Sequence, residues 1–429
     1  MLDRSVKATG DDAMLAKLAT TKAGYYVDPF LDAFSRSSSA DDSKNSSSSE
    51  TASRGQTANG RRRVVQPLIK RGTHARVCVM DRAISTFLKM DEELPCQVVI
   101  LGAGKDTSYF RYRNGNLMGM NQEEEQTQNK GSNAGRQPPR RVPRHRQADS
   151  TTNQREVHWY EVDHVSVVTE KATLIRKSNL LKSFCPLLVK TETGYESGAS
   201  SGGLGSLSGG LGSLSSSSKP SPTYRLIGHD LRESPTILLE KIKLNPTLPT
   251  LFIMECVSMY IPITESKSLL QALSLSSDTV YIACYEPIIG MGDPFGRVME
   301  RNLVKKGIAS PDCCLLQTRT LKDQLQKLVD AEGFRRSVGC NMWNAYETIV
   351  TAAQRQRANQ SEFMDEYEEW ILIMQHYCLV VAQGGRSSSS GDAPPLSSPW
   401  TMIRDPGADD KKQLSLGWVS GKCSQLETE

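Results

Sequence analysis

The apolar positions of this chain gather in four short runs that predict buried β-strands. The runs cover residues 98–101, 159–163, 224–231 and 249–256 and are rich in branched and aromatic side chains. Each reaches a glycine or a carboxylate just before a stretch of helical spacing. Because the carboxyl ends of parallel strands meet at one edge of a sheet, the pattern predicts a single crevice at that edge.

Helical spacing and shorter apolar runs predict further elements around these strands. Apolar residues along the helices are expected to pack in the core. The alternation of strands and helices is typical of an α/β fold. Helices are expected at 11–19, 76–88, 266–273, 293–306, 320–332, 344–353 and 363–374, and strands at 280–285, 334–338 and 377–382.

A glycine turn follows the first strand. Val98, Val99, Ile100 and Leu101 lead into Gly102-Ala103-Gly104. Glycines allow the backbone to turn sharply and bring its amides close to a ligand at the end of a central strand. A Gly-x-Gly sequence is common in tight turns, so its interpretation depends on the elements that follow.

The second run, Trp159–Asp163, ends in an acidic residue at the position where a nucleotide-binding sheet holds a ribose. Asp163 lies 59 residues after Gly104, whereas the usual offset is about twenty. Residues 113–155 are polar and lack apolar spacing, so they are expected to be an insertion. Without these 43 residues the offset is 16. An alternative role for Asp163 is to cap the following helix.

The third and fourth runs place more acidic residues at strand ends. At Asp230-Leu231 a hydrogen-bond acceptor stands beside an apolar side chain, and a purine ring would lie between these two groups. The apolar run 249–256 reaches Glu255. Each carboxylate has an alternative role as a helix cap or ion-pair partner. Their shared position at the ends of several strands favours one ligand site.

Low-complexity tracts interrupt the chain. Residues 36–63 and 190–222, like 113–155, are expected to be insertions, and 386–429 a flexible tail. The tract 190–222 contains a tandem seven-residue repeat, Gly-Gly-Leu-Gly-Ser-Leu-Ser, which is too short for a solenoid. The remainder suffices for one large α/β domain, expected at 11–385.

Composition restricts the class of protein. The net charge is +4, and the dense basic stretch 136–146 lies inside an expected insertion, so no nucleic-acid binding is expected. No apolar run is long enough for a membrane span, and residues 1–10 lack a secretory pattern. Ten scattered cysteines without Cys-x-x-Cys indicate a reducing compartment, the cytoplasm or alternatively the nucleus. No metal site is expected.

Short motifs follow one another in a fixed order over roughly residues 20–383. They resemble the leucine carboxyl methyltransferase family, whose members use S-adenosyl-L-methionine to esterify a protein's C-terminal leucine. The sequence departs from the family pattern at Val257-Ser258-Met259-Tyr260 and in its long insertions, which affects loops more than chemistry. The motifs lie at 25–30, 71–76, 101–107, 161–163, 230–232, 255–256, 285–286, 293–299, 364–366 and 376–378.

The resemblance implies a Rossmann-like methyltransferase sheet with N-terminal helices and long insertions, and S-adenosyl-L-methionine as cofactor. Lys22 and Tyr26 are expected near the cofactor or the peptide. The other residues implied in cofactor binding are Arg76 (its carboxylate), Gly102 (its methionine moiety), Asp163 (its ribose), Asp230 and Leu231 (its adenine) and Glu255 (its ammonium).

By the same resemblance the acceptor is the C-terminal leucine of the catalytic subunit of type 2A serine/threonine phosphatase, and the enzyme is expected to be a monomer. A terminal carboxylate has a reference pKa near 3.5 and is already ionised, so no general base is expected. Three alternatives remain: a carboxyl methyltransferase acting on a modified guanosine of transfer RNA, a small-molecule O-methyltransferase of the same fold, and a non-catalytic binding protein.

Overall fold

The computed structural model describes most of the 429-residue chain. The described residues are 2–35, 65–91, 94–118, 155–197, 223–290, 292–305, 307, 310–331, 333–386 and 417–420.

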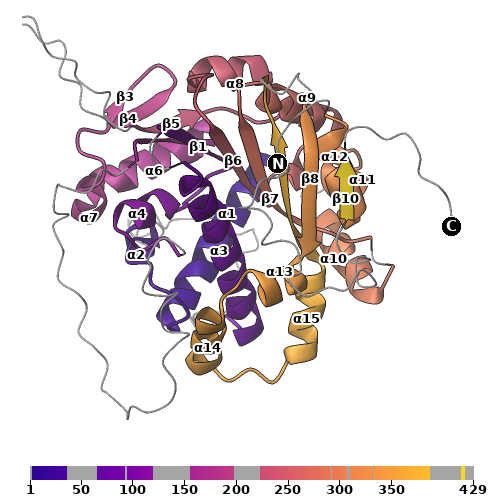
Figure 1. Cartoon of the computed structure of the whole chain (residues 1–429). Coiled ribbons are helices and arrows are strands. Elements are labelled where there is room, and N and C mark those ends of the chain that lie inside the picture. The colour runs from indigo at the N-terminus through magenta and orange to yellow at the C-terminus, as the bar shows by residue number, and fades with distance from the viewer. Residues whose placement is uncertain are drawn as a thin grey trace, which may run out of the picture.

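Within these residues a single sheet forms the centre of the molecule (Figure 1). Its strands lie in the order β10-β8-β9-β7-β6-β1-β2-β5-β4-β3. Their bounds are β1 Cys96–Leu101, β2 Val157–Asp163, β3 Val189–Lys190, β4 Gly194–Ser197, β5 Tyr224–Gly228, β6 Thr250–Glu255, β7 Val280–Pro287, β8 Phe334–Asn341, β9 Tyr377–Gly384 and β10 Gly417–Ser420.

The central strands β7, β6, β1, β2 and β5 are parallel. From β1 the chain moves outward through β2 to the edge strands β3 and β4, turns back to place β5 beside β2, and then crosses to the other side of β1 to form β6 and β7. The strand order therefore reverses between β1 and β6. In an open α/β sheet such a reversal opens a crevice beyond the carboxyl ends of the strands. The strands β9, β8 and β10 complete this side in antiparallel pairing.

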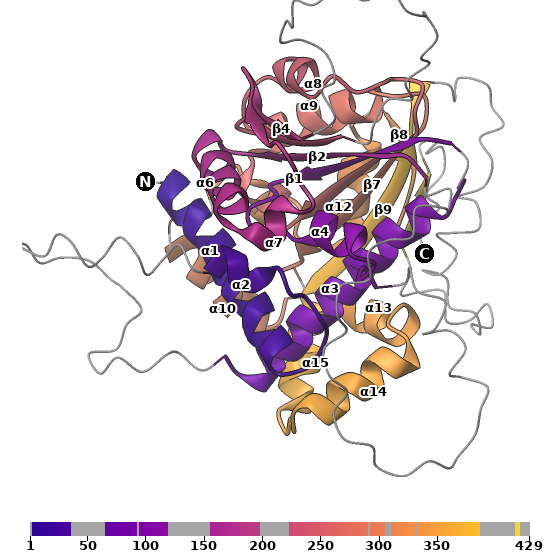
Figure 2. The ribbon, with the colours of Figure 1, turned by 90° about the vertical axis from the view of Figure 1, so that its left-hand side faces the viewer.

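Helices cover both faces of the sheet. Figure 2 shows α8 and α9 on one side and α3 and α6 on the other. The bounds are α1 Leu2–Lys22, α2 Leu31–Ser35, α3 Pro67–Leu88, α4 Ser108–Arg113, α6 Val165–Lys177, α7 Asn179–Lys182, α8 Pro235–Ile242, α9 Ile263–Ser274, α10 Pro294–Lys305, α11 Cys314–Gln317, α12 Leu321–Val329, α13 Met342–Thr348, α14 Ala352–Ser361 and α15 Tyr367–Gln375.

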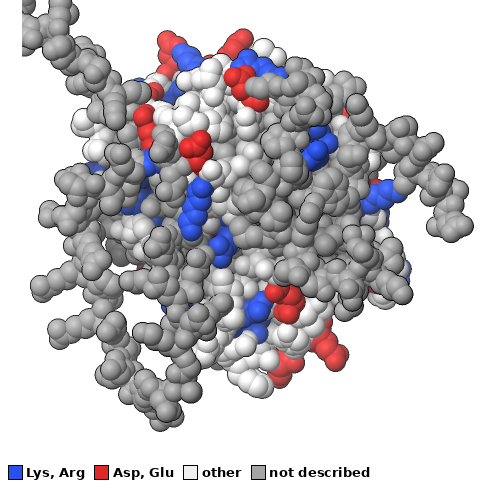
Figure 3. Space-filling view, viewed as in Figure 1, with Lys and Arg blue, Asp and Glu red and all other residues white. Residues whose placement is uncertain are grey.

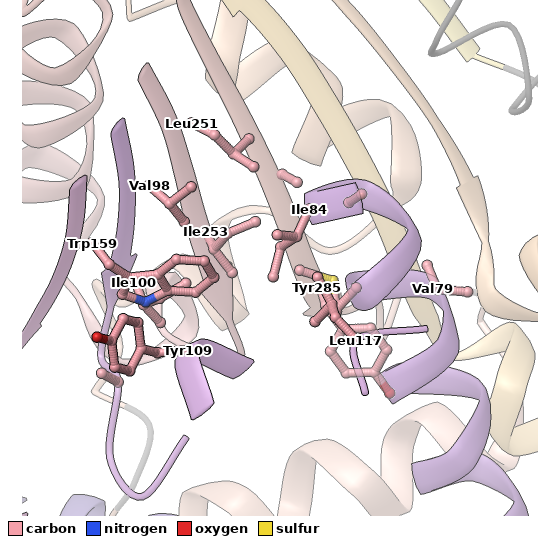
Figure 4. Packing of buried hydrophobic residues seen from close by; sticks show 14 of the residues in the cluster. Val79, Ile84, Val98, Ile100, Tyr109, Leu117, Trp159, Leu251, Ile253 and Tyr285 are labelled. Carbon is pink, nitrogen blue, oxygen red and sulfur yellow. The ribbon is translucent and has the colours of Figure 1, made fainter. Parts of the chain in front are cut away.

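The alternation of side chains along β1 divides the core between the two faces. Val98 and Ile100 pack toward α3, in the cluster seen in Figure 4 with Trp159 and Ile253. Val99 and Leu101 pack on the opposite face with side chains of α8, α9 and α12. Successive residues of a strand point to opposite faces, so a strand covered on both sides is apolar throughout. This explains the continuous apolar run in the sequence.

The strands predicted from apolar runs are confirmed, including the antiparallel strand at 377–382. The helix predicted at 344–353 is wrong in extent, because α13 ends at Thr348 and a separate helix, α14, begins at Ala352. Thr351 starts α14 with a capping box: its side chain accepts from the Gln354 backbone, and Gln354 bonds back to the Thr351 amide.

Three predicted boundaries of low-complexity tracts are wrong. Leu117, inside the expected insertion 113–155, is buried in the core. Residues 190–197, inside the expected insertion 190–222, include β4, which pairs with β5. Part of the expected tail, Gly417–Ser420, forms β10 and pairs with β8. Residues 119–154, 198–222, 387–416 and 421–429, and all of 36–63, lie outside the described residues. The fold also begins before residue 11, because α1 starts at Leu2.

The surface and the helices bear on two classes of partner. On the face shown in Figure 3, the described Lys and Arg side chains are interspersed with Asp and Glu. Nucleic-acid backbones are bound by continuous basic surfaces, and the described part of this face does not show one. In the described part of the chain, no helix combines the length and apolar character needed to cross a membrane.

Candidate active site

A cavity of about 530 Å³ opens beyond the carboxyl ends of β1, β2, β5 and β6. It lies at the reversal of strand order, where the sheet topology places a ligand site. Side chains of α1 and α10 close it from the solvent side of the strand ends. Six of the eight residues predicted from the sequence to lie at or near the cofactor line it: Arg76, Gly102, Asp163, Asp230, Leu231 and Glu255.

The glycine turn after β1 forms one wall of the cavity. Gly102 and Gly104 have φ angles of +66° and +48°, a region that side-chain-bearing residues rarely adopt. A Cβ atom on Gly102 would lie 2.5 Å from Cγ2 of Val257, so the residue also permits close packing against the loop after β6. The turn is held by the Gly102 amide, which donates to the Val162 carbonyl at 2.8 Å.

Asp163 is fixed at the end of β2 by two backbone donors. The Gly104 amide donates to Oδ2 at 2.7 Å, and the His164 amide donates to Oδ1 at 2.7 Å. Burial raises the pKa of Asp163, while these two donors act in the opposite direction. Each carboxylate oxygen retains a second lone pair for a ligand hydroxyl. The aspartate is thus both a link to the glycine turn and an available acceptor.

Arg76 and Glu255 meet at the end of β6. Arg76 Nε lies 2.7 Å from Glu255 Oε2, and its guanidinium stacks over the Tyr285 ring at 4.8 Å. Burial raises the pKa of Glu255, but Lys17 and Arg76 outweigh it and hold the pKa below its ordinary value. The cavity therefore presents a fixed cation beside a fixed anion. An amino acid's carboxylate and ammonium groups require that pair of charges.

Asp230 and Leu231 lie at the end of β5. Arg232 Nε lies 2.9 Å from Asp230 Oδ1 and 3.1 Å from Oδ2, and these bonds lower the pKa of Asp230. Leu231 packs against the core and shows its edge to the cavity. The neighbouring His229 is buried, and its Nε2 has no hydrogen-bond partner among the described residues. This part of the cavity thus offers an apolar contact, from Leu231, beside a polar atom without a hydrogen-bond partner among the described residues, His229 Nε2.

The structure does not bring Lys22 or Tyr26 to the cavity. Lys22 is 57% exposed, and its Nζ lies 3.5 Å from Asp32 Oδ1. Tyr26 is buried away from the cavity lining. The lysine that enters the site is Lys17, whose Nζ lies 3.4 Å from Asp106 Oδ2 and 3.8 Å from Glu255 Oε2. Five residues of helix rotate a side chain by about 140°, so Lys17 and Lys22 face different directions.

Asp106 is a second site residue that was not singled out from the sequence beyond its place in a motif. Its Oδ1 accepts from the Ser108 amide at 2.8 Å, at the start of α4. Burial raises its pKa, but Lys17 and Lys171 outweigh this and hold the pKa below its ordinary value. Asp106 and Glu255 thus place two ionised carboxylates around the Lys17 ammonium.

A buried ion pair, Lys171 with Glu161, contacts the segment that follows the glycine turn. Lys171 Nζ lies 2.5 Å from Glu161 Oε2 and donates to the Asp106 carbonyl at 2.7 Å. The Tyr224 hydroxyl donates to the same Glu161 oxygen at 2.9 Å. Burial raises the pKa of Glu161 to about 7. The contacts tie β2, β5 and α6 to the segment that follows Gly104.

Another part of the cavity lining is apolar, and most of its side chains belong to one packed cluster; this part is called the apolar end. No obvious sequence signal marked these residues as a site, because they come from separate helices and loops. A hydrophobic group of an acceptor would be desolvated here, next to the polar half of the cavity. The side chains at this end are Met14, Met259, Tyr260, Met299, Leu303 and Tyr377.

The apolar part of the cavity lining shows no group poised as a base or nucleophile at neutral pH. His164, which also lines the cavity, is exposed and caps α6, where its Nδ1 lies 3.0 Å from Ser166 Oγ. Burial raises the pKa of Cys256 to about 12 and that of Tyr260 to about 12, so both are neutral. Burial lowers the pKa of His229, and its Nδ1 lies 3.4 Å from the Lys241 ammonium and 3.9 Å from Glu233 Oε2. Among the described residues, no cluster of His, Cys, Asp and Glu has the grouping of a metal site.

Comparisons with known proteins agree with this geometry. The profile of the leucine carboxyl methyltransferase family matches residues 5–121 and 145–274. Leucine carboxyl methyltransferase 1 of Aspergillus fumigatus is 26% identical, over 94% of this chain and 87% of that protein. The Rattus norvegicus protein of the same name is 27% identical, over 89% of this chain and 91% of that protein. An Arabidopsis thaliana homolog is 25% identical, over 90% of this chain and 92% of that protein.

Among solved structures, phosphoethanolamine N-methyltransferase 2 of Haemonchus contortus with S-adenosyl-L-methionine is 10% identical. The match covers 71% of this chain and 51% of that chain with a TM-score of 0.34, a likeness too weak to carry an argument.

The sheet and the family match together define an S-adenosyl-L-methionine-dependent methyltransferase. The family profile covers more than half of the sequence, and full-length relatives align along most of it. The chain belongs to the leucine carboxyl methyltransferase family, and it is a carboxyl methyltransferase of that family.

The residues of the cavity fit this cofactor. Gly102 has no side chain, which leaves room for the cofactor at the turn. The Nε2 atom of His229 has no hydrogen-bond partner among the described residues and can contact a polar atom of the cofactor. We propose that Arg76 and Lys17 bind its carboxylate, Glu255 its ammonium and Asp163 its ribose hydroxyls, with Asp230 and Leu231 at the adenine. When bound, the cofactor supplies a methyl group on a sulfonium.

Proposed function

We propose that the enzyme methyl-esterifies the α-carboxylate of the C-terminal leucine of the catalytic subunit of type 2A serine/threonine phosphatase. The observation that carries the proposal is the composition of the cavity. Its charged residues fit the cofactor, the lining also includes a cluster of apolar side chains, and the titratable residues beside that cluster, Cys256 and Tyr260, are neutral. A leucine side chain suits the apolar half. The relatives named leucine carboxyl methyltransferase 1 support the same acceptor chemistry.

The absence of a base among the described lining residues is consistent with a carboxylate acceptor. A terminal carboxylate is ionised at neutral pH and is itself the nucleophile, so no proton has to be removed. The protein's contribution is then to align the two reactants and to exclude water. Alignment alone is worth on the order of 7–11 kcal/mol in the most favourable intramolecular reactions. The charges of carboxylate and sulfonium disappear as the bond forms, so a dry pocket favours the reaction.

Met259 and Tyr260 connect the two halves of the cavity. They follow Glu255 within one loop, which begins with Cys256 at a φ angle of +55°. The loop is anchored by the buried Glu286, whose Oε1 accepts from the Ser258 amide at 2.9 Å. Lys327 Nζ donates to the Ser258 hydroxyl at 2.8 Å. The loop thus holds the cofactor's ammonium partner and the apolar acceptor contacts in a fixed relation.

The experiment is a methyl-transfer assay with labelled cofactor and purified phosphatase catalytic subunit, either complete or lacking its last leucine. We expect label in the complete protein, no label in the truncated one, and release of the label by alkali as expected for an ester. A free peptide of the same tail should be a poorer acceptor, because remote contacts help to position the reacting group. Label in transfer RNA, or in an alkali-stable linkage, would contradict the proposal.

A further inference from the structure

The helix α10 contributes to the cavity with one narrow face. Met299 and Leu303, one turn apart, line the apolar end. Gly296 is the buried residue of the helix, and a Cβ atom there would lie 2.8 Å from the Ile289 carbonyl oxygen. Figure 1 shows α10 at the periphery of the molecule. One stripe of α10 therefore packs against the fold, and the remaining surface of the helix faces solvent.

The solvent face of α10 carries a basic stripe. Arg297, Arg301 and Lys305 follow one another at intervals of four residues and are all exposed. Such residues lie on one side of a helix, within about 80° of one another. Val298 and Val304 flank the stripe and are 47% and 45% exposed. The helix thus presents a cationic row bordered by apolar side chains.

The acidic groups of this helix and its N-terminal turn are engaged elsewhere. Glu300 Oε2 lies 2.6 Å from the Arg319 guanidinium, and Asp293 Oδ2 lies 3.0 Å from His376 Nε2. Arg297 donates to the Gly292 carbonyl oxygen at 2.7 Å, not to a carboxylate.

No ion pair joins Arg301 or Lys305 to any residue that the structure describes. Like charges four residues apart destabilise a helix. The described fold does not offset that repulsion, whereas an anionic partner would.

We propose that the solvent face of α10 binds an acidic segment of the acceptor protein, upstream of the carboxylate that enters the cavity. This inference rests on the proposed function, because it takes the acceptor to be a polypeptide C-terminus. The stripe supplies the charge complementarity, and Val298 and Val304 supply contacts for apolar side chains of the same segment. A purely electrostatic site for phosphates would not need the exposed valines.

Geometry sets the position of the acidic residues. A helix with its side chains is about 10 Å wide, and an extended chain covers about 3.3 Å per residue. About three residues are therefore needed to pass from the cavity side of α10 to its solvent face. The acidic side chains should lie from about the fourth position before the terminal residue onward.

The test compares two synthetic peptides that end in leucine with a free carboxylate. One carries glutamates from the fourth to the eighth position before the end, and the other carries glutamines there. Binding to the full-length enzyme is measured by fluorescence anisotropy, with cofactor affinity measured separately. We expect the double variant Arg301→Glu/Lys305→Glu to bind the glutamate peptide about tenfold more weakly, which corresponds to about 1.4 kcal/mol. The milder Arg301→Gln/Lys305→Gln should lose less.

A matched control changes the same charge elsewhere. Lys177 and Lys182 are exposed on α6 and α7, which lie on the opposite side of the molecule from α10 in Figure 1. The variant Lys177→Glu/Lys182→Glu should bind both peptides as the parent enzyme does. Cofactor affinity should be unchanged in all variants, and added salt should weaken binding of the glutamate peptide by the parent enzyme.

Three results would overturn the inference. The first is equal binding of the two peptides by the parent enzyme, including no binding of either. The second is an unaltered affinity of the Arg301→Glu/Lys305→Glu variant for the glutamate peptide. The third is that binding of a short RNA depends on these two residues while binding of the glutamate peptide does not. Failure of the proposed function would look different, because the parent enzyme would then transfer no methyl group to the phosphatase whatever the peptides bind.

Discussion

Arg76 on α3 and Glu255 at the end of β6 lie 179 positions apart in the chain and form an ion pair of 2.7 Å at the cavity. We propose that each residue exchanges this partner for the opposite charge of the cofactor's amino-acid moiety. The pair would keep both side chains ordered before the cofactor binds, so less conformational freedom is lost on binding.

Removal of the charged contacts to the cofactor should weaken its binding. Arg76→Ala and Asp163→Ala should each raise the cofactor Kd tenfold or more while the fold persists, because a hydrogen bond to a charged group contributes about 1.5–3 kcal/mol. Calorimetric titration measures the Kd, and circular dichroism checks the fold. Arg76→Lys should recover only part of the loss, since an ammonium does not form the two parallel bonds of a guanidinium. An unchanged Kd in both alanine variants would refute the assignment.

The two lysines of α1 should differ sharply. Lys17→Met removes an ammonium that lies within 3.8 Å of both Asp106 and Glu255, and should weaken cofactor binding about tenfold. Lys22→Met changes an exposed residue paired with Asp32 and should leave the Kd within twofold. The same titration tests both variants. A larger increase of the cofactor Kd in Lys22→Met than in Lys17→Met would favour the sequence-based prediction that Lys22 lies near the cofactor, and would contradict the site described here.

The rate of the methyl-transfer step should be independent of pH from about pH 7 to about pH 9. The acceptor carboxylate is ionised throughout. Burial raises the pKa of Cys256 and of Tyr260 to about 12, so neither loses a proton below pH 9. Burial lowers the pKa of His229, so the ring is already neutral at pH 7. Single-turnover rates in constant-ionic-strength buffers measure this. A bell-shaped profile centred within the window would reveal a base that the site lacks in this account.

The two ends of the segment 190–222 should behave differently on deletion. Removing 198–222 should leave the melting temperature nearly unchanged, because Ser197 pairs with Tyr224 in adjacent strands and loop length affects stability only logarithmically. Removing 190–222 also removes Tyr195, which is buried and packs under Arg176 at 4.8 Å. This deletion should cost about 2 kcal/mol or more. Equal melting temperatures would show that β4 contributes nothing.

The strand ends of the site were predictable, because a strand buried on both faces is apolar throughout and the residue that ends the run stands out. Gly102, Asp163 and Glu255 were located in this way. Lys17 was not, since the direction of a helical side chain depends on how α1 packs. Here Met14 and Leu18 are the buried residues that orient the helix. The apolar end of the cavity was missed for a related reason: its residues meet only in the folded chain.

The missed elements lacked a periodic apolar signal. Four residues form β4, with one buried aromatic side chain, and antiparallel pairing with β5 makes them a strand. The helix α14 is polar, with Gln354 and Ala358 as its buried residues, so spacing of apolar residues does not reveal it. Its capping box at Thr351 and Gln354 is visible in the sequence and was the available signal.

The most direct test of the central claim is mass spectrometry of the phosphatase C-terminal peptide after reaction with the parent enzyme and with Arg76→Ala. The account predicts one methyl ester on the terminal leucine carboxylate with the parent enzyme, and a strongly reduced amount with the variant at a cofactor concentration near the parent Kd. A methyl group on a side chain, no methylation by the parent enzyme, or equal methylation by both enzymes would contradict it.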